Sequence, residues 1–343
     1  MAKQQPVNTK RVFFTKDDTA LPIPNLLDHQ RNSWKDLVET GIGEIFAEIN
    51  PVDDYTGQKL SLSFRKYWFG EPKFSEAWAK ENNVTFEAPL YASVELVNKV
   101  TGEVKEQEIY LGDYPWMTDR GTFIVNGTER VVVSQLIRSA GVFFTADNVA
   151  GRNLYGAKII PGRGAWLELE TAANNAIYVK IDRRRKLPIT TVLRALGGYS
   201  NTEMKKMFAE AEGEGINYIA ATLEKDTSRS QSEALIEVYR RLRPGDLATV
   251  ENAKNMIERM FFDFKRYDYS RVGRFKLNQR LKVDLPNTTE NRTFQISDFI
   301  EIITEIINFN STQAPADDID DLSNRRVKLV GELVARQFRV GML

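Results

Sequence analysis

Residues 90–110 read LYASVELVNKVTGEVKEQEIY, and this stretch decides how the first part of the chain folds. Apolar and polar side chains alternate from Ala92 to Leu96, a period of two that is typical of a strand with one buried face. A turn at residues 101–103 leads into a second run over 104–109, which can pair with the first. The stretch therefore predicts an antiparallel hairpin.

Patterns on both sides of this hairpin extend the β-rich region. Apolar residues alternate with serines over 60–64, and residues 122–125 end at Asn126-Gly127, a dipeptide that favours tight turns. The three valines at 131–133 then favour a buried strand or the start of a helix. Before all of these, Asn25 can cap a helix over about 26–40.

The second part of the chain mixes strands and helices. Short apolar runs predict strands near 159–160, 166–169 and 177–181, and amphipathic spacing predicts helices near 230–242, 250–262 and 299–307. The sequence therefore indicates an α+β protein of two domains. Residues 324–343 carry apolar side chains at helical spacing and stop without a cap, so we expect the chain to be truncated there.

Composition excludes several classes of protein. The 343 residues include 47 Lys+Arg, 47 Asp+Glu and 42% hydrophobic residues, the proportions of a soluble globular protein. With no Cys and only His29, a structural zinc site, a Cys nucleophile and a His-based triad are nearly excluded. No apolar run is long enough for a membrane span or a signal peptide, so we expect a cytoplasmic protein without a membrane partner.

Three local clusters could carry chemistry. The basic run at 180–186 is either a solvated surface with salt bridges or a phosphate-binding site. The acidic run at 317–321 is either a helix cap, a Mg²⁺ site or an acceptor for a base edge. Residues 162–166, ending in Trp166, form either a turn before a core tryptophan or a platform for base stacking. The sequence has no phosphate-binding glycine loop of the ATP or NAD type.

Several blocks together give the chain a family resemblance. The sequence resembles the β subunit of bacterial DNA-directed RNA polymerase at residues 117–136 (MTDRGTFIVNGTERVVVSQL), 181–188 (IDRRRKLP), 241–245 (RLRPG), 266–268 (RYD) and 317–326 (DDIDDLSNRR). The blocks span nearly the whole chain in the family's order. Two positions depart from the common pattern: Ala140 replaces a proline and Ser323 replaces a glycine.

The resemblance implies a domain organisation. Residues 1–138 would be the first part of a β-rich protrusion domain with flanking helices, and 139–316 a mixed α+β lobe. Residues 317–343 would begin the return to the protrusion.

The resemblance also implies a role in holding downstream DNA and the non-template strand. Trp166 would stack on an unpaired base, Asp320 would accept hydrogen bonds from a flipped guanine, and basic residues would hold phosphates. The implied DNA-binding residues are Arg138, Trp166, Asp182, Arg183, Arg184, Ile319, Asp320 and Arg325.

Two further sites follow from the resemblance. Arg130, Val133 and Gln135 match the edge of the rifamycin pocket. Val104, Lys105 and Glu106 match a strand edge to which the transcription-repair coupling factor or a CarD-type regulator adds a strand.

The family relation implies a nucleotidyltransferase in which this segment has no catalytic residue, no metal ligand and no cofactor. The catalytic Mg²⁺ would lie in the partner subunit β′, on an Asp triad, so the segment alone is expected to be inactive. The implied partners are DNA, the subunits α, β′ and ω, and a σ factor, with an association with the nucleoid. Two alternatives stay open: a stand-alone interaction module that binds a regulator through the strand edge, and a nuclease that uses residues 317–321.

Overall fold

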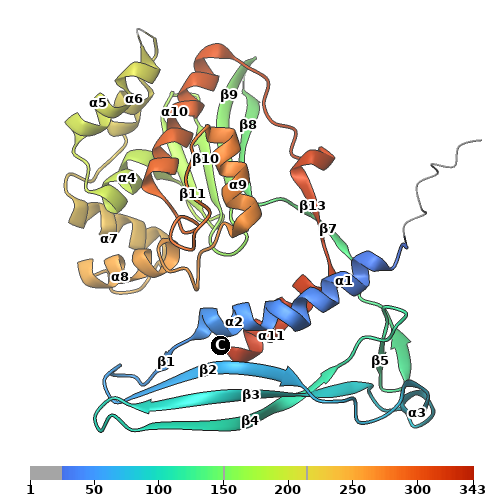
Figure 1. Ribbon diagram of the computed structural model, residues 1–343. Coiled ribbons are helices and arrows are strands. Elements are labelled where there is room, and N and C mark those ends of the chain that lie inside the picture. The colour runs from blue at the N-terminus through green and yellow to red at the C-terminus, as the bar shows by residue number, and fades with distance from the viewer. Residues whose placement is uncertain (1–24, 150, 214) are drawn as a thin grey trace, which may run out of the picture. The chain divides into compact units, whose positions relative to one another are not determined.

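The computed structural model describes residues 25–149, 151–213 and 215–343, which divide into two compact units (Figure 1). Unit 1 consists of the described residues up to Ser134 together with Leu329–Leu343, and unit 2 is Gln135–Lys328. The α+β class is confirmed, since helices accompany antiparallel sheets in the two units. The division falls at 134/135 and 328/329, whereas the sequence analysis places its boundaries at 138/139 and 316/317.

Unit 1 contains a four-stranded antiparallel sheet in the order β1-β2-β3-β4. Its strands are β1 (Val52–Asp53), β2 (Leu60–Phe69), β3 (Glu87–Asn98) and β4 (Val104–Pro115). The predicted hairpin is confirmed as β3–β4, with Val97 opposite Val104. The Asn98 side chain shapes the connecting loop because its oxygen accepts the backbone N–H groups of Val100 and Thr101.

Helices cover one face of this sheet. The predicted first helix is confirmed and continues further, as α1 (Asp28–Asp36), a π-helical turn η1 (Leu37–Gly41) and α2 (Ile42–Ile49). The chain returns at its other end as α11 (Val330–Met342), which packs on α1, η1 and α2. The shared core consists of Leu37, Ile42, Ile45, Phe46, Ile49, Leu90 and Phe338. Gly331 allows the closest approach, since a Cβ there would lie 2.1 Å from the carbonyl oxygen of Ser33.

A small second layer completes unit 1. It comprises α3 (Glu76–Glu81), β5 (Phe123–Val125) and β6 (Thr128–Arg130), and the predicted turn at Asn126-Gly127 joins the two strands. The expectation for 131–133 is wrong. Those residues form neither strand nor helix, and Val131 and Val133 are 57% and 72% exposed because the chain leaves the hairpin there.

Unit 2 is built on a five-stranded antiparallel sheet in the order β12-β11-β10-β9-β8. Its strands are β8 (Gly141–Val149), β9 (Arg152–Ile160), β10 (Leu167–Thr171), β11 (Ile177–Ile181) and β12 (Leu187–Pro188). A separate two-stranded ribbon pairs β7 (Gln135–Arg138) with β13 (Arg325–Lys328). Val327, expected on a helix, lies in β13 and is 53% exposed.

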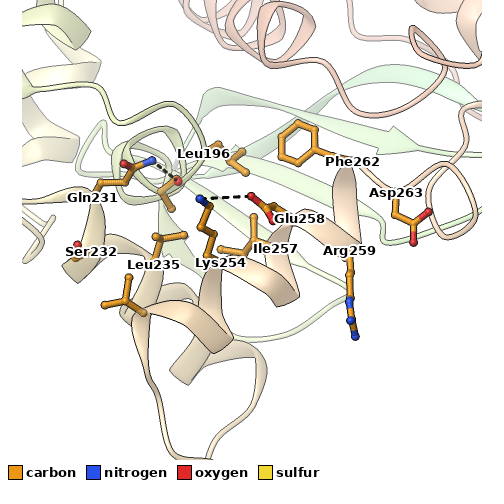
Figure 2. A pocket seen from close by; sticks show the side chains of 12 residues that line it. Leu196, Gln231, Ser232, Leu235, Lys254, Ile257, Glu258, Arg259, Phe262 and Asp263 are labelled. Atoms are coloured by element: carbon orange, nitrogen blue, oxygen red, sulfur yellow. Dashed lines mark hydrogen bonds and ion pairs between the residues drawn. The ribbon is translucent and has the colours of Figure 1, made fainter. Parts of the chain in front are cut away.

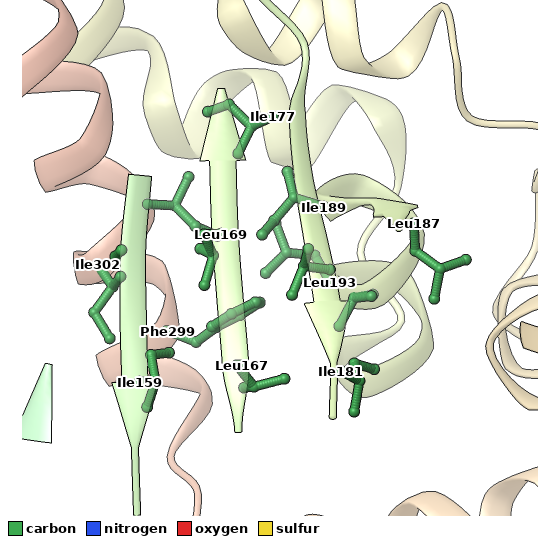
Figure 3. Close-up of a cluster of buried hydrophobic side chains, with 14 of the residues drawn as sticks. Ile159, Leu167, Leu169, Ile177, Ile181, Leu187, Ile189, Leu193, Phe299 and Ile302 are labelled. Atoms are coloured by element: carbon green, nitrogen blue, oxygen red, sulfur yellow. The ribbon is translucent and has the colours of Figure 1, made fainter. Parts of the chain in front are cut away.

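Helices pack on the unit 2 sheet and bury its alternating apolar residues. The helices of unit 2, which pack on the sheet or on one another, are α4 (Ile189–Gly197), α5 (Asn201–Glu212), α6 (Tyr218–Leu223), α7 (Gln231–Leu242), α8 (Val250–Phe261), α9 (Ser270–Leu281) and α10 (Ile296–Thr312). The short 3-10 turn η2 (Leu322–Asn324) has no buried residue and contacts β13. Figure 3 shows Leu169 and Ile181 of the strands lying with Leu193 of α4 and Phe299 of α10 in one apolar cluster. The strands predicted near 159, 167 and 177 and the three predicted helices are confirmed. Among the described residues, no helix has both the length and the apolar character to cross a membrane.

Candidate nucleic-acid interface

The basic run predicted as a phosphate site forms a tight turn at the end of β11. The backbone N–H of Arg184 donates to the carbonyl oxygen of Ile181 at 2.9 Å, and Asp182 and Arg183 have φ of +48° and +59°. Positive φ at both central residues is the geometry of a type I′ turn, which asparagine and glycine normally occupy. Here the turn directs the arginines outward, since Arg183, Arg184 and Arg185 are all exposed.

The two lysines that flank these arginines have partners within the sheet. Lys180 forms an ion pair with Glu170 at 2.5 Å, which raises the pKa of its amine, and Lys186 lies 3.6 Å from the same carboxylate. The Lys186 ammonium also lies 4.6 Å from the centre of the Tyr178 ring. The run therefore divides into lysines that make salt bridges and arginines that face solvent.

Trp166 lies beside the arginine turn. Trp166 precedes β10. Its backbone N–H donates to the Asp182 carboxylate at 2.9 Å, and its backbone carbonyl accepts the backbone N–H of Asp182 at 2.9 Å. The guanidinium of Arg183 lies 5.7 Å from the centre of the half-buried indole ring. Gly164 fixes the approach to Trp166, because its φ of +120° and a gap of 2.7 Å from a Cβ to Tyr267 exclude larger residues. A partly exposed ring beside a cation can stack on an unpaired base.

A basic groove adjoins this turn and was not predicted as a unit. It is an open hollow of about 810 Å³ between the 164–165 and 182–184 segments and helices α7 and α8. Its charged lining residues are Arg184, Arg243, Arg259, Arg266 and Asp182. The groove therefore carries an excess of positive charge suited to phosphate oxygens. Arg243 and Arg266 lie in blocks quoted for the resemblance, but Arg259 comes from the last turn of α8 and no local motif marks it.

A neighbouring pocket shares one residue with the groove. Figure 2 shows this second pocket between α4, α7 and α8, with apolar walls that include Leu196, Ile257 and Phe262. Lys254 and Glu258 pair across its rim at 3.8 Å, and Arg259 lines both hollows. None of the predicted DNA-binding residues lies in this second pocket.

The remaining predicted DNA-binding residues gather at the β7–β13 ribbon. Arg138 lies opposite Arg325 across the two strands. The side chain of Asp320 is 88% exposed, and one of its carboxylate oxygens lies 4.0 Å from an Nη atom of Arg138. Ile319 is half-buried beside it in the sequence. The structure thus brings the predicted residues of unit 2 into two groups, one around Trp166 and one around Asp320.

The acidic run does not gather its carboxylates around one point. The Asp317 carboxylate accepts the backbone N–H of Phe144, and the carboxylates of Asp318 and Asp321 accept the backbone N–H groups of Asp320 and Ser323. Within residues 25–149, 151–213 and 215–343, no three His, Cys, Asp or Glu side chains are grouped as metal ligands. The nuclease alternative therefore has no supporting geometry in these ranges.

The other two predicted sites are the strand edge for a regulator and the edge of the rifamycin pocket. Val104, Lys105 and Glu106 are exposed on β4, which is an edge strand because, among the described strands, it pairs only with β3. Arg130 ends β6 and Val133 follows it, both in unit 1, whereas Gln135 begins β7 in unit 2.

Comparison with known proteins gives one family. The model for "RNA polymerase Rpb2, domain 2" matches residues 137–328. The chain is 45% identical over 97% of its length to the DNA-directed RNA polymerase subunit beta of Syntrophomonas wolfei, and 43% identical over 97% to that of Chloroflexus aggregans. It spans 29% and 30% of the lengths of these curated relatives.

Proposed function

Since the chain belongs to the RNA polymerase β-subunit (Rpb2) family, we propose that it serves that subunit by holding DNA with unit 2. The observation that carries this proposal is the arginine turn at 181–184 beside Trp166 and the basic groove. Exposed guanidinium groups bind phosphates of any sequence, and an indole ring stacks on any unpaired base. The combination suits DNA at the border between paired and unpaired strands.

Within this proposal the two groups of residues have different tasks. Arg183, Arg184 and the groove arginines hold the backbone, and Trp166 stacks on a base of the non-template strand. At the ribbon, Arg138 and Arg325 hold phosphates. Asp320 accepts hydrogen bonds from the Watson–Crick edge of a flipped guanine, whose N1–H and exocyclic amino group are adjacent donors. The first group supplies affinity and the second supplies base preference.

DNA binding by the purified chain tests the first group. We expect Arg184→Gln to weaken binding to duplex and forked DNA alike and to lower the salt slope by about one. Trp166→Ala should weaken binding to forked DNA by about tenfold and leave duplex binding unchanged. Arg240→Gln, which removes an exposed arginine of α7 outside the groove lining, is the charge-matched control. The measurement is fluorescence anisotropy across a salt series; no binding to forked DNA at low salt would contradict the proposal.

We also propose that the β4 edge docks a transcription regulator. Its residues 104–106 are exposed and its outer edge is unpaired in the described sheet, so a partner strand can add to it by main-chain hydrogen bonds. The same edge is what a stand-alone interaction module would use. The regulator would be of the CarD type or the transcription-repair coupling factor.

A pair of proline variants tests the strand edge. Because N–H groups along a strand point alternately to its two sides, either Lys105→Pro or Glu106→Pro removes an outward donor. We expect the variant that removes the outward donor to abolish capture of the regulator without changing the melting temperature of unit 1. Lys105→Ala and Glu106→Ala keep every N–H and should bind normally. Equal capture by all four variants would exclude strand addition.

The wider assignment follows from the family. We propose that the complete subunit acts in DNA-templated RNA synthesis with α, β′, ω and σ, that the catalytic Mg²⁺ is held by β′, and that Arg130, Val133 and Gln135 border the rifamycin pocket. The names protrusion and lobe would then apply to units 1 and 2. The test is reconstitution: the chain alone should make no RNA, and a β subunit in which it replaces the matching part of a relative should restore synthesis.

A further inference from the structure

The loop that carries Asp320, residues 317–324, is held at its start by three interactions of Asp317. Its carboxylate accepts the backbone N–H of Phe144 at 2.8 Å and pairs with Arg280 at 3.1 Å, and its own N–H donates to the Phe144 carbonyl at 3.0 Å. Asp317 therefore attaches the start of the loop to β8 and α9.

Two more aspartates shape the middle of the loop. The Asp318 carboxylate accepts the N–H of Asp320 at 2.9 Å, and the Asp321 carboxylate accepts the N–H of Ser323 at 2.8 Å. This second bond lowers the pKa of Asp321. Among the four aspartates, only Asp320 accepts no backbone hydrogen bond in the described structure, and its side chain is 88% exposed. Asp318, Asp320 and Asp321 are all exposed, and among them only the Asp320 carboxylate is not engaged by a backbone N–H group of the described residues.

Two side chains of helix α9 also hold the loop. The Lys276 amine donates to the Ser323 carbonyl at 2.7 Å, and burial lowers the pKa of this amine. One turn further along α9, the Arg280 guanidinium lies 4.8 Å from the centre of the Phe144 ring and 5.5 Å from that of Phe309. Two cations on one face of α9 therefore hold the two ends of the acidic loop.

We propose that Lys276 and Arg280 are positioning residues that set base specificity through Asp320 without touching DNA. The proposal rests on the proposed contact between Asp320 and a guanine. A carboxylate on a mobile loop loses backbone freedom when it binds, whereas a fixed one does not, so anchoring favours the one base that offers two donors in the right place. Freed from α9, the loop would still carry its charge but would discriminate less between bases.

The test compares two DNA templates in RNA polymerase assembled with a chimeric β subunit, in which this chain replaces the matching part of a relative. The templates differ only in whether the flipped non-template base is guanine or adenine, and the readout is the ratio of the lifetimes of the two DNA complexes. Asp320→Ala should bring this ratio to about one. Lys276→Met should lower the ratio by about three- to tenfold, and Lys276→Arg, which restores a donor, should recover most of it.

Controls separate positioning from loss of structure. Lys206→Met removes an exposed lysine of α5 and should leave the ratio unchanged. Lys276→Met should raise hydrogen exchange at the amides of Ser323 and Asn324 and leave the melting temperature unchanged, because Lys276 contributes a single hydrogen bond at the edge of unit 2.

Two contrary results can be told apart. If Asp320→Ala keeps the guanine preference, the proposed contact of Asp320 is wrong. If Asp320→Ala abolishes the preference but Lys276→Met and Arg280→Met both keep it, the contact stands and the positioning role is excluded.

Discussion

Arg274 of α9 and Asp298 of α10 form an ion pair with side chains only 0% and 1% exposed. One guanidinium nitrogen lies 2.5 Å from the carboxylate, and the Arg274 Nε donates to Asn278 at 2.8 Å. Removing one partner leaves a buried charge, so we expect Asp298→Asn to lower the free energy of unfolding of unit 2 by about 3–5 kcal/mol. Urea unfolding followed by tryptophan fluorescence measures this change.

An exposed pair provides the control for that prediction. Lys254 and Glu258 lie 3.8 Å apart on α8 with 65% and 54% of their side chains exposed. Because water screens such a pair, Glu258→Gln should change stability by no more than about 0.5 kcal/mol. Equal effects of Asp298→Asn and Glu258→Gln would show that the Arg274 pair is not desolvated in solution.

Glu129 gives unit 1 a dependence on pH. Hydrogen bonds from Lys80, Thr122 and Arg120 lower its pKa from 4.5 to about 2. A carboxyl group with a depressed pKa stabilises the fold fully above pH 4.5 and loses that contribution as pH falls toward 2. We expect the melting temperature of unit 1 to fall over this window and Glu129→Gln to flatten part of the fall. Identical pH profiles for the variant and the parent would refute the assignment.

Residue types predicted some site members and could not predict others. Trp166, Asp182 and Arg183 are close to one another because a strand and its turn bring them together. The local patterns at 162–166 and 180–186 drew attention to these segments but left a structural interpretation open, and the family resemblance selected the individual residues. Arg259 lies in the last turn of α8 and Lys276 in the middle of α9, and no local motif marks either residue. The roles proposed for them depend on which helix packs beside the turn and the acidic loop, and that packing is decided by the whole core rather than by neighbouring residues.

At the scale of elements, the turn after β11 holds Asp182 and Arg183 in place at a cost in the conformational stability of unit 2. Asp182 and Arg183 both occupy a left-handed backbone conformation that costs energy for residues other than glycine and asparagine. We expect the double change Asp182→Asn with Arg183→Gly to stabilise unit 2 by about 0.5–1 kcal/mol and to weaken DNA binding severalfold. Thermal unfolding and anisotropy on the same samples measure both effects. A gain in stability with unchanged affinity for DNA would mean that the turn has no role in binding.

Element types were predictable where one periodicity ran long enough. The β3–β4 hairpin and the helices α7, α8 and α10 follow their patterns because each buries one regular face. Residues 131–133 and Val327 do not form the elements that their apolar patterns predict. Val131, Val133 and Val327 lie where the chain leaves a hairpin or forms a short ribbon, and their side chains are exposed, whereas Val132 alone packs against a core cluster. Hydrophobicity by itself does not reveal this difference.

At the scale of the whole molecule, unit 2 has the features of an independent domain. Its main core contains residues of unit 2 only, and its two ends are paired through β7 and β13. We expect residues 135–328 expressed alone to fold and melt in one cooperative transition, as followed by circular dichroism. The shorter piece 135–316 lacks β13 and the anchored acidic loop and should melt at a lower temperature. A non-cooperative melt of residues 135–328 would show that unit 2 depends on the rest of the chain.

Because α11 returns to unit 1 after unit 2, unit 1 cannot finish folding during synthesis until unit 2 has been translated. The sheet of unit 1 and its helices α1, α2 and α3 are translated before unit 2, whereas α11, with Gly331 and Phe338, leaves the ribosome only after all of unit 2 has emerged. At bacterial elongation rates that interval is on the order of ten seconds or more. During this interval the apolar side chains of unit 1 that later contact α11 stay uncovered and accessible to chaperones. Of the two units, unit 1 begins to be translated first and is completed second.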